Sequence, residues 1–287
     1  MKIAKTAAQV REELNPVRRT GRTLGLVPTM GALHEGHLSL IDAARADCDF
    51  VAVSIFVNPL QFGPNEDLAA YPRAPERDLA ACEARGVGLV FLPPVEAMYA
   101  GECLTQVSVA RLSETLCGAS RPGHFAGVCT VVTKLLHIVQ PDRAYFGAKD
   151  YQQAAIIRKM VFDLDFPLTV VVCPTVREAD GLAMSSRNAY LTPEQRRQAP
   201  ALYGALKMAE GLIRRERPPA DAVQAAVRRY LARHAADGMI DYVQIVDPAE
   251  LSDVQTTDSA VLIALAVKFG GARLIDNLLV DAPGGDD

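Results

Sequence analysis

Residues 24–37 read LGLVPTMGALHEGH, and this stretch decides the fold of the chain. Its first four residues form an apolar run typical of a buried parallel strand, and a turn containing Gly31 follows. His34 and His37 then stand three residues apart at the predicted start of a helix. A strand, a turn and a helix start present backbone N–H groups and a positive helix end to phosphate, and two imidazoles add further donors. The stretch therefore indicates a phosphate site.

The overall composition excludes several classes of protein. The chain has 287 residues, 49% hydrophobic and 22% charged, which is ordinary for a globular protein with a sizeable core and room for two domains. Its net charge of −4 provides no field that would recruit nucleic acid or an anionic membrane. Six cysteines without C-x-x-C spacing predict reduced thiols. With no apolar leader and no uncharged run of membrane-spanning length, we expect a cytoplasmic protein without nucleic-acid or membrane partners.

Apolar runs alternate with helical patterns up to about residue 175, which predicts an α/β fold. We expect a Rossmann-like, doubly wound parallel sheet, with strands at 23–27, 50–57, 87–92, 143–146 and 168–172 and helices at 38–46, 76–85, 126–139 and 151–162. In this architecture a ligand lies beyond the carboxyl ends of the strands. Three polar segments fall there: 34–37, 58–61 and 147–150.

The pattern changes after residue 176. Helical stretches at 193–216 and 219–235 precede strand-like runs at 241–246, 260–267 and 273–280, which is typical of a small α+β domain. We therefore predict two domains, residues 1–176 and residues 177–287.

The two histidines have a structural and a metal alternative. A helix-start pair can simply be exposed or hydrogen-bonded locally. A zinc site of the H-E-x-x-H type needs a spacing of four and a third ligand. The spacing of three, after a glycine turn, favours phosphate over zinc.

Two later segments also suit an anionic ligand. Lys149 follows a strand and precedes a helix, where a cation is unfavourable unless an anion binds, while Asp150 is expected to cap that helix. Ser185, Ser186 and Arg187 offer two hydroxyls and a guanidinium in a polar loop, which can cradle phosphate or form an ordinary turn.

Neutral donors accompany these segments. Gln61 and Gln153 can hold a carboxylate without a full ion pair, which preserves its nucleophilicity; the alternative for each is a surface glutamine. Residues 121–125 precede an apolar helix and are expected to form a turn and cap.

Together these segments resemble the pantoate–β-alanine ligase family of the "HIGH"-motif nucleotidyltransferase superfamily. The matching pieces are 28–40, 54–62 with 67–73, 121–134, 141–153 and 174–191, in the order of the family, and GGARLIDN at 270–277 extends the likeness. The resemblance implies that pantoate attacks the α-phosphate of ATP to give pantoyl adenylate and pyrophosphate, and that β-alanine then displaces AMP to give pantothenate. It also implies Mg²⁺, a homodimer, and a C-terminal domain that closes over the ATP site.

The resemblance assigns roles to individual residues. The catalytic group is His34, His37, Lys149, Ser185, Ser186 and Arg187, all at the ATP phosphates. The further ATP-binding residues are Pro28, Met30, Gly147, Asp150, Val176 and Met184, with Asp150 on the ribose side. The pantoate site is Gln61, Gln153, Met30 and Phe62, with Pro28 as a further apolar wall.

The metal ligand is where the sequence departs from the family pattern. Some relatives carry adjacent acidic residues where this chain has Arg77-Asp78. Asp78 is the candidate Mg²⁺ ligand, and the alternative is a carboxylate on a helix surface. The loop 63–71 is a candidate lid that excludes water from the acyl adenylate.

Three other functions compete with this one. The nearest is a nucleotidyltransferase of the same fold that adenylylates a phosphate ester, which would need more basic residues in place of the two glutamines. A metal-dependent hydrolase would use His34 and His37. A non-catalytic nucleotide-binding module is the third.

Overall fold

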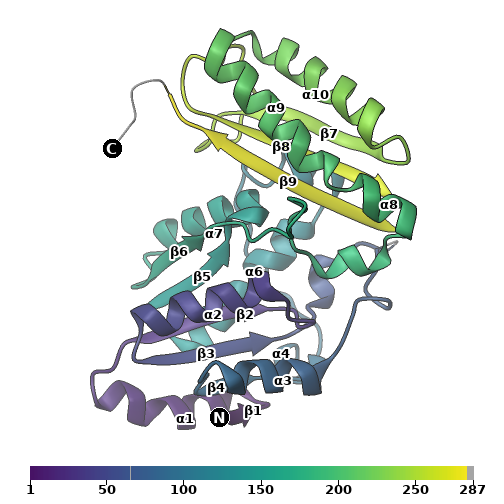
Figure 1. Cartoon of the computed structure of the whole chain (residues 1–287). Coiled ribbons are helices and arrows are strands. Elements are labelled where there is room, and N and C mark those ends of the chain that lie inside the picture. The colour runs from purple at the N-terminus through teal and green to yellow at the C-terminus, as the bar shows by residue number, and fades with distance from the viewer. Residues whose placement is uncertain (65, 283–287) are drawn as a thin grey trace. The chain divides into compact units, whose positions relative to one another are not determined.

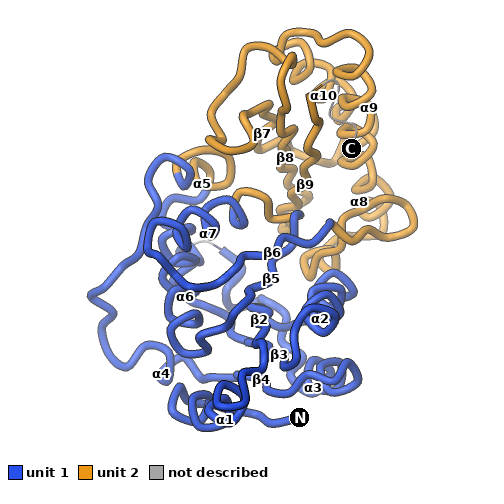
Figure 2. The backbone as a smooth tube through the Cα atoms, turned by 90° about the vertical axis from the view of Figure 1, so that its left-hand side faces the viewer, with its two compact units in different colours: residues 1–113, 121–148, 153–174 blue, residues 114–120, 149–152, 175–287 orange. Residues whose placement is uncertain are grey.

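The computed structural model of the chain describes residues 1–64 and 66–282 (Figure 1). The residues divide into two compact units (Figure 2). Unit 1 comprises residues 1–113, 121–148 and 153–174, and unit 2 comprises residues 114–120, 149–152 and 175–287. The chain therefore passes from unit 1 into most of unit 2 between residues 174 and 175. Two short earlier segments, 114–120 and 149–152, also belong to unit 2.

Unit 1 contains a six-stranded parallel sheet with the order β1-β4-β3-β2-β5-β6. This topology confirms the predicted doubly wound α/β class. The strands are β1 (Lys2–Ala4), β2 (Leu24–Thr29), β3 (Phe50–Ile55), β4 (Leu89–Phe91), β5 (Arg143–Gly147) and β6 (Thr169–Cys173). β2 lies between β3 and β5, so the strand order reverses at the β2–β5 pair, and ligands of such sheets bind beyond the carboxyl ends of that pair.

Helices cover both faces of this sheet. Figure 2 shows α2 and α3 on one side of the strands and α6 and α7 on the other. The bounds are α1 (Ala7–Arg19), α2 (Glu35–Asp47), α3 (Pro75–Ala84), α4 (Val95–Met98), α6 (His124–Val139) and α7 (Tyr151–Asp163), with 3₁₀ turns η1 (Pro59–Gln61) and η2 (Ala148–Asp150). Alternate strand residues such as Val51 and Val53 pack with Ile41 of α2 and Cys82 of α3 in one buried cluster.

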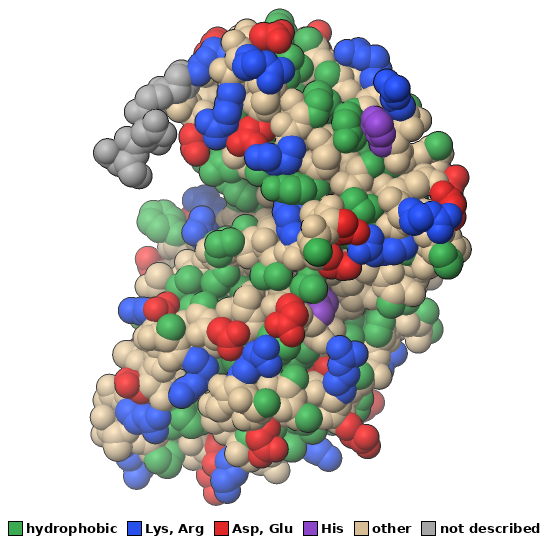
Figure 3. Space-filling view, in the orientation of Figure 1, with side chains coloured by type: hydrophobic (Ala, Val, Ile, Leu, Met, Phe, Trp, Pro, Cys, Tyr) green, Lys and Arg blue, Asp and Glu red, His purple; other side chains and the backbone are tan. Residues whose placement is uncertain are grey.

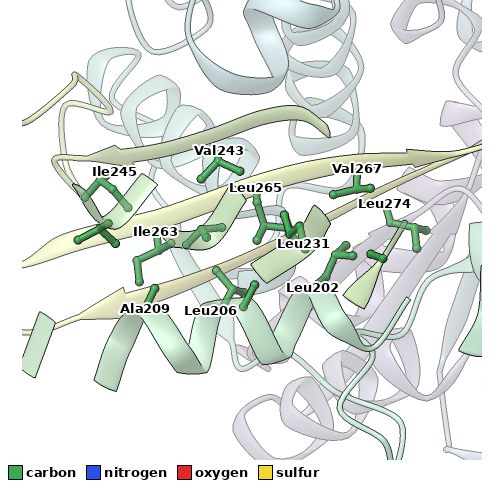
Figure 4. Packing of buried hydrophobic residues seen from close by; sticks show 14 of the residues in the cluster. Leu202, Leu206, Ala209, Leu231, Val243, Ile245, Ile263, Leu265, Val267 and Leu274 are labelled. Carbon is green, nitrogen blue, oxygen red and sulfur yellow. The ribbon is translucent and has the colours of Figure 1, made fainter. Parts of the chain in front are cut away.

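Unit 2 contains an antiparallel sheet of β7 (Met239–Val246), β8 (Val261–Phe269) and β9 (Ala272–Val280). Its helices are α5 (Leu116–Ser120), α8 (Pro193–Gln198), α9 (Ala201–Glu216) and α10 (Ala220–His234), with the 3₁₀ turn η3 (Ser186–Tyr190). Figure 4 shows Ile263 and Leu265 of β8 facing Leu206 of α9 and Leu231 of α10, and these side chains are fully or almost fully buried. This packing of helices on an antiparallel sheet confirms the small α+β part.

The single helix predicted at 193–216 is wrong. The structure divides it into α8 and α9, with Pro200 between them. A proline has no N–H for the helical ladder, and its ring clashes with the carbonyl of the preceding turn.

The surface carries both signs of charge. On the face in Figure 3, lysine and arginine side chains alternate with aspartate and glutamate, and no single basic patch forms there. Within the described residues, no helix is both long enough and apolar enough to cross a membrane.

Candidate active site

The turn between β2 and α2 is held by a buried carboxylate. Gly31 and Ala32 have φ angles of +83° and +50°, a left-handed conformation that costs free energy for alanine. Asp78 of α3 is 1% exposed, and its Oδ2 and Oδ1 accept the backbone N–H groups of Ala32 and Leu33, each at 2.8 Å. A Cβ on Gly31 would come within 3.1 Å of Asp78 Oδ2. The turn therefore keeps its shape through a contact between two elements far apart in sequence.

The predicted helix start at the two histidines is confirmed. His34 is the N-cap of α2, and its Nδ1 accepts the N–H of Gly36 at 3.1 Å. The backbone N–H of His34 donates to His37 Nδ1 at 3.4 Å, and the two ring centroids lie 4.1 Å apart. Because both Nδ1 atoms accept hydrogen bonds, the neutral rings carry their protons on Nε2. Each histidine thus presents an Nε2–H donor.

Gln61 is buried, so the surface alternative is wrong for this residue. It is 9% exposed; its Nε2 lies 2.9 Å from Met30 Sδ, and its Oε1 accepts from Asn58 Nδ2 at 3.2 Å. Asn58 also donates to Gly127 O at 3.0 Å and accepts from Tyr99 Oη at 2.8 Å. The structure therefore brings two predicted pantoate residues, Gln61 and Met30, into contact.

An ion pair that no local pattern predicts ties the 63–71 loop to the start of α6. Arg121 donates to both carboxylate oxygens of Glu66, at 2.7 and 2.5 Å, and its Nη1 lies 3.0 Å from His124 Nε2. His124 Nδ1 lies 2.8 Å from the carbonyl oxygen of Gln61. The expected turn and cap at 121–125 is thus also a clamp, which we define as Glu66, Arg121 and His124. Asn65, in the same loop, lies outside the described residues.

Burial raises the pKa of Glu66, but hydrogen bonds and charge from Arg121 lower it more, so the net pKa lies below its usual value. The carboxylate therefore stays ionised, and the clamp intact, until the pH falls through this lowered value.

Four further candidates lie in unit 1. Gly147 is the last residue of β5, and the Cβ of a substituent there would meet no neighbouring atom within 4 Å. Gln153 is half-buried on α7, and Phe62 is half-buried with its ring edge-on to Tyr71 at 5.9 Å. Pro28, also half-buried, lies near the carboxyl end of β2.

In unit 2 a small pocket brings Lys149 and Ser185 together. The Lys149 side chain is 20% exposed, and its Nζ lies 3.7 Å from Asp150 Oδ1. The pocket is lined by Lys149, Leu182, Ala183, Ser185, Asn188, Leu202, Leu274, Ile275 and Asp276. Asp150 closes η2, which runs directly into α7, in place of the separate N-cap that the sequence predicts.

The loop that contains Ser185, Ser186 and Arg187 follows a tight hairpin at residues 176–184 and continues into η3. Met184 N–H donates to the carbonyl oxygen of Val176 at 3.0 Å, and Gly181 takes a φ of +92° at the tip. Ser185 caps η3 by accepting the N–H of Arg187 at 3.3 Å. The ordinary-turn geometry is therefore present, and it places Ser185, Ser186 and Arg187 in succession at the start of η3.

Residues of β9 that sequence reasoning left without a role support these segments. Asp276 is 3% exposed, and its carboxylate accepts two hydrogen bonds from Arg177, at 2.6 and 3.0 Å. The Arg177 guanidinium lies 3.8 Å from the Tyr203 ring centroid. Asn277 Nδ2 donates to the carbonyl oxygen of Lys149 at 2.8 Å. Asp276 and Asn277 lie in the GGARLIDN segment, and the likeness of that segment to the family is the sequence signal from which a role for them could have been predicted.

The described residues do not form a protein metal centre. No group of three His, Cys, Asp or Glu side chains among them is arranged to hold a metal ion. Asp78 is buried rather than on a helix surface, so that alternative is wrong, and each of its oxygens accepts a backbone N–H. A hydrolase built on His34 and His37 therefore finds no third ligand among the residues described.

Comparison with known proteins decides the family. A family model described as pantoate-beta-alanine ligase matches residues 2–279. The chain belongs to the pantoate–β-alanine ligase family. This confirms the resemblance seen in the sequence and makes the chain a carbon–nitrogen ligase.

Relatives of this ligase family match along nearly their whole length. Pantothenate synthetases of Moorella thermoacetica and Desulfitobacterium hafniense are 54% and 53% identical over 281 residues, covering 98% of this chain and 99% of each relative. The crystal structure of the Thermus thermophilus enzyme has a TM-score of 0.92 at 47% identity and covers 97% of this chain and 99% of its own. The Francisella tularensis ligase, complexed with β,γ-ATP and β-alanine, has a TM-score of 0.80 at 34% identity and covers 97% of each chain.

Proposed function

We propose that the chain joins pantoate to β-alanine through a pantoyl adenylate. A carboxylate oxygen of pantoate attacks the α-phosphorus of ATP, and the bond to pyrophosphate breaks. The amine of β-alanine then attacks the acyl carbon, the C–O bond to AMP breaks, and the amine loses a proton. The observation that carries this proposal is the histidine pair, whose Nε2–H donors follow β2 at the reversal of strand order.

The ATP-binding residues would act by position and charge. His34, His37, Lys149, Ser185, Ser186 and Arg187 contact the phosphates in this proposal, while Pro28, Met30, Gly147, Asp150, Val176 and Met184 line the nucleotide. Adenylation asks little covalent chemistry of the protein. In-line placement contributes roughly 7–11 kcal/mol and each well-placed donor roughly 3–4 kcal/mol. The Francisella relative, complexed with β,γ-ATP and β-alanine, supports ATP and β-alanine as substrates.

Pantoate would be held by neutral amides. Gln61 and Gln153 donate to its carboxylate or hydroxyls in this proposal, and Met30 and Phe62 cover its methyl groups. The Gln61 Nε2 contact with Met30 supports a shared subsite. A carboxamide donor leaves the carboxylate more nucleophilic than a salt bridge would.

Gln153→Ala is expected to raise the KM for pantoate about tenfold, because the loss of one hydrogen bond is worth roughly 1.4 kcal/mol, while the KM for ATP changes less than about twofold. Steady-state kinetics with each substrate varied in turn checks this. Gln255→Ala, at an exposed glutamine of unit 2, is the matched control. An unchanged pantoate response in Gln153→Ala would refute the assigned role.

The 63–71 loop is proposed as a lid that the Glu66–Arg121–His124 clamp orders. Saturation with MgATP and pantoate is expected to slow thermolysin cleavage within this loop severalfold, and Glu66→Gln to weaken that protection by removing the ion pair. The cleavage rate is followed by mass spectrometry at neutral pH, where the lowered pKa of Glu66 keeps the wild-type clamp charged. Equal sensitivity with and without substrates would count against a lid.

Mg²⁺ would enter as part of the MgATP substrate, held by phosphate oxygens and water, since the described residues form no metal centre.

A homodimer is supported by exposed apolar side chains of unit 1, Phe162 at 77% and Leu164 at 52%, close in sequence to the edge strand β6. The six free cysteines agree with a reducing compartment such as the cytoplasm.

ATP–pyrophosphate exchange tests the proposed function. Exchange that requires pantoate but not β-alanine is the expected result, because the adenylate forms before the amine reacts. Exchange without pantoate, or with a phosphate ester in its place, would favour the rival nucleotidyltransferase of the same fold.

A further inference from the structure

The backbone of Lys149 is held by a side chain from a distant strand of the same unit. Asn277 Nδ2 donates to the Lys149 carbonyl oxygen at 2.8 Å, across 128 positions of sequence. Lys149 lies in the short 3₁₀ turn η2, and such turns have poorer hydrogen-bond geometry than an α-helix. The hydrogen bond from Asn277 to this carbonyl therefore restricts the position of the Lys149 backbone, from which the side chain extends.

Strand β9 also holds the hairpin that leads to the Ser185 loop. Asp276, beside Asn277, takes both hydrogen bonds from Arg177 and also accepts the backbone N–H of Asn277 at 2.8 Å. Neighbouring residues of a strand point to opposite faces. One dipeptide of β9 thus supports two segments that the proposed function places at the phosphates.

We infer that Asn277 is a positioning residue for Lys149 in adenylate formation. This inference rests on the proposed role of Lys149. In this role Asn277 acts through the backbone of Lys149 rather than through a contact with substrate. A lysine displaced by about 1 Å loses much of its effect on the phosphate charge, and a misplacement of that size can cost about a hundredfold in rate.

Two substitutions at Asn277 test the inference. Asn277→Ala removes the donor, and Asn277→Asp keeps the side-chain size but replaces the donor with a carboxylate oxygen. Both are expected to slow pantoate-dependent ATP–pyrophosphate exchange at least ~10-fold. The second half-reaction, measured with preformed pantoyl adenylate and β-alanine, should stay within about twofold of wild type. Asn15→Ala, at an exposed asparagine of α1, is the matched control.

A double-mutant cycle separates positioning from a general structural role. If Asn277 acts through Lys149, the double variant Lys149→Ala/Asn277→Ala exchanges no more slowly than Lys149→Ala alone. Additive losses, or an equal slowing of both half-reactions with a lowered Tm, would overturn the inference.

The same experiment distinguishes this inference from the proposed function. Normal exchange in Asn277→Ala, beside an active wild type, would overturn the inference alone. A wild-type chain without pantoate-dependent exchange would overturn both.

Discussion

Lys149→Ala and His37→Ala are each expected to slow pantoate-dependent ATP–pyrophosphate exchange at least ~100-fold. In the proposed mechanism each variant removes one donor from the phosphates while charge moves toward the leaving pyrophosphate, and one such donor is worth roughly 3–4 kcal/mol. Lys149 lines the pocket of unit 2 beside Ser185, and His37 presents its Nε2–H because its Nδ1 accepts the N–H of His34. Exchange rates at saturating pantoate and ATP measure the effect.

Matched variants control for the loss of a side chain. Lys159→Ala removes a lysine of α7 that pairs with Asp163, and His137→Ala removes an exposed histidine of α6. Both are expected to retain wild-type exchange. If Lys149→Ala or His37→Ala does the same, the role of that residue has been misassigned.

Asp78→Ala is expected to lower the free energy of unfolding by about 2–4 kcal/mol. The substitution leaves the N–H groups of Ala32 and Leu33 without their acceptor, and a buried donor left unpaired costs about 1–3 kcal/mol. Release of the left-handed turn at Gly31 and Ala32 should also slow exchange at least ~10-fold. Urea unfolding at neutral pH gives the stability, and Glu76→Ala, at an exposed acid of the same helix, is the control.

A magnesium titration distinguishes this structural role from the metal role expected from the family. Asp78→Asn retains one accepting oxygen and is the variant to use if Asp78→Ala does not fold. A structural role predicts that raising the Mg²⁺ concentration restores neither stability nor exchange. Restoration of exchange by Mg²⁺, with stability unchanged by the substitution, would instead assign Asp78 to the metal.

Most of the fold could be predicted because its elements carry strong local patterns. The β-branched runs at β3 and β6, and the alternation of strands with helices, identify the parallel sheet. β1 was not predicted, because a strand of three residues is too short to show a periodic pattern. α1 carries Pro16 in its interior, which interrupts a helical pattern that its capping box and buried face otherwise stabilise.

The candidate site likewise has a part that the sequence predicts and a part that it does not. His34 and His37 could be predicted from one short stretch of sequence, because a helix start is a local feature. Asp78, which holds their turn from α3, and Asn277, which holds Lys149 from β9, act through contacts across 45 to 128 positions. Local periodicity contains no information on such pairings, since they depend on which surfaces meet after folding.

The most direct test of adenylate formation follows one oxygen atom. Pantoate labelled with ¹⁸O in its carboxylate is incubated with ATP and β-alanine, and the phosphate-containing products are analysed by mass spectrometry. Attack on the α-phosphorus followed by cleavage of the acyl C–O bond predicts AMP carrying one ¹⁸O atom and unlabelled pyrophosphate. Unlabelled AMP, or label in inorganic phosphate released together with ADP, would contradict a pantoyl-adenylate intermediate.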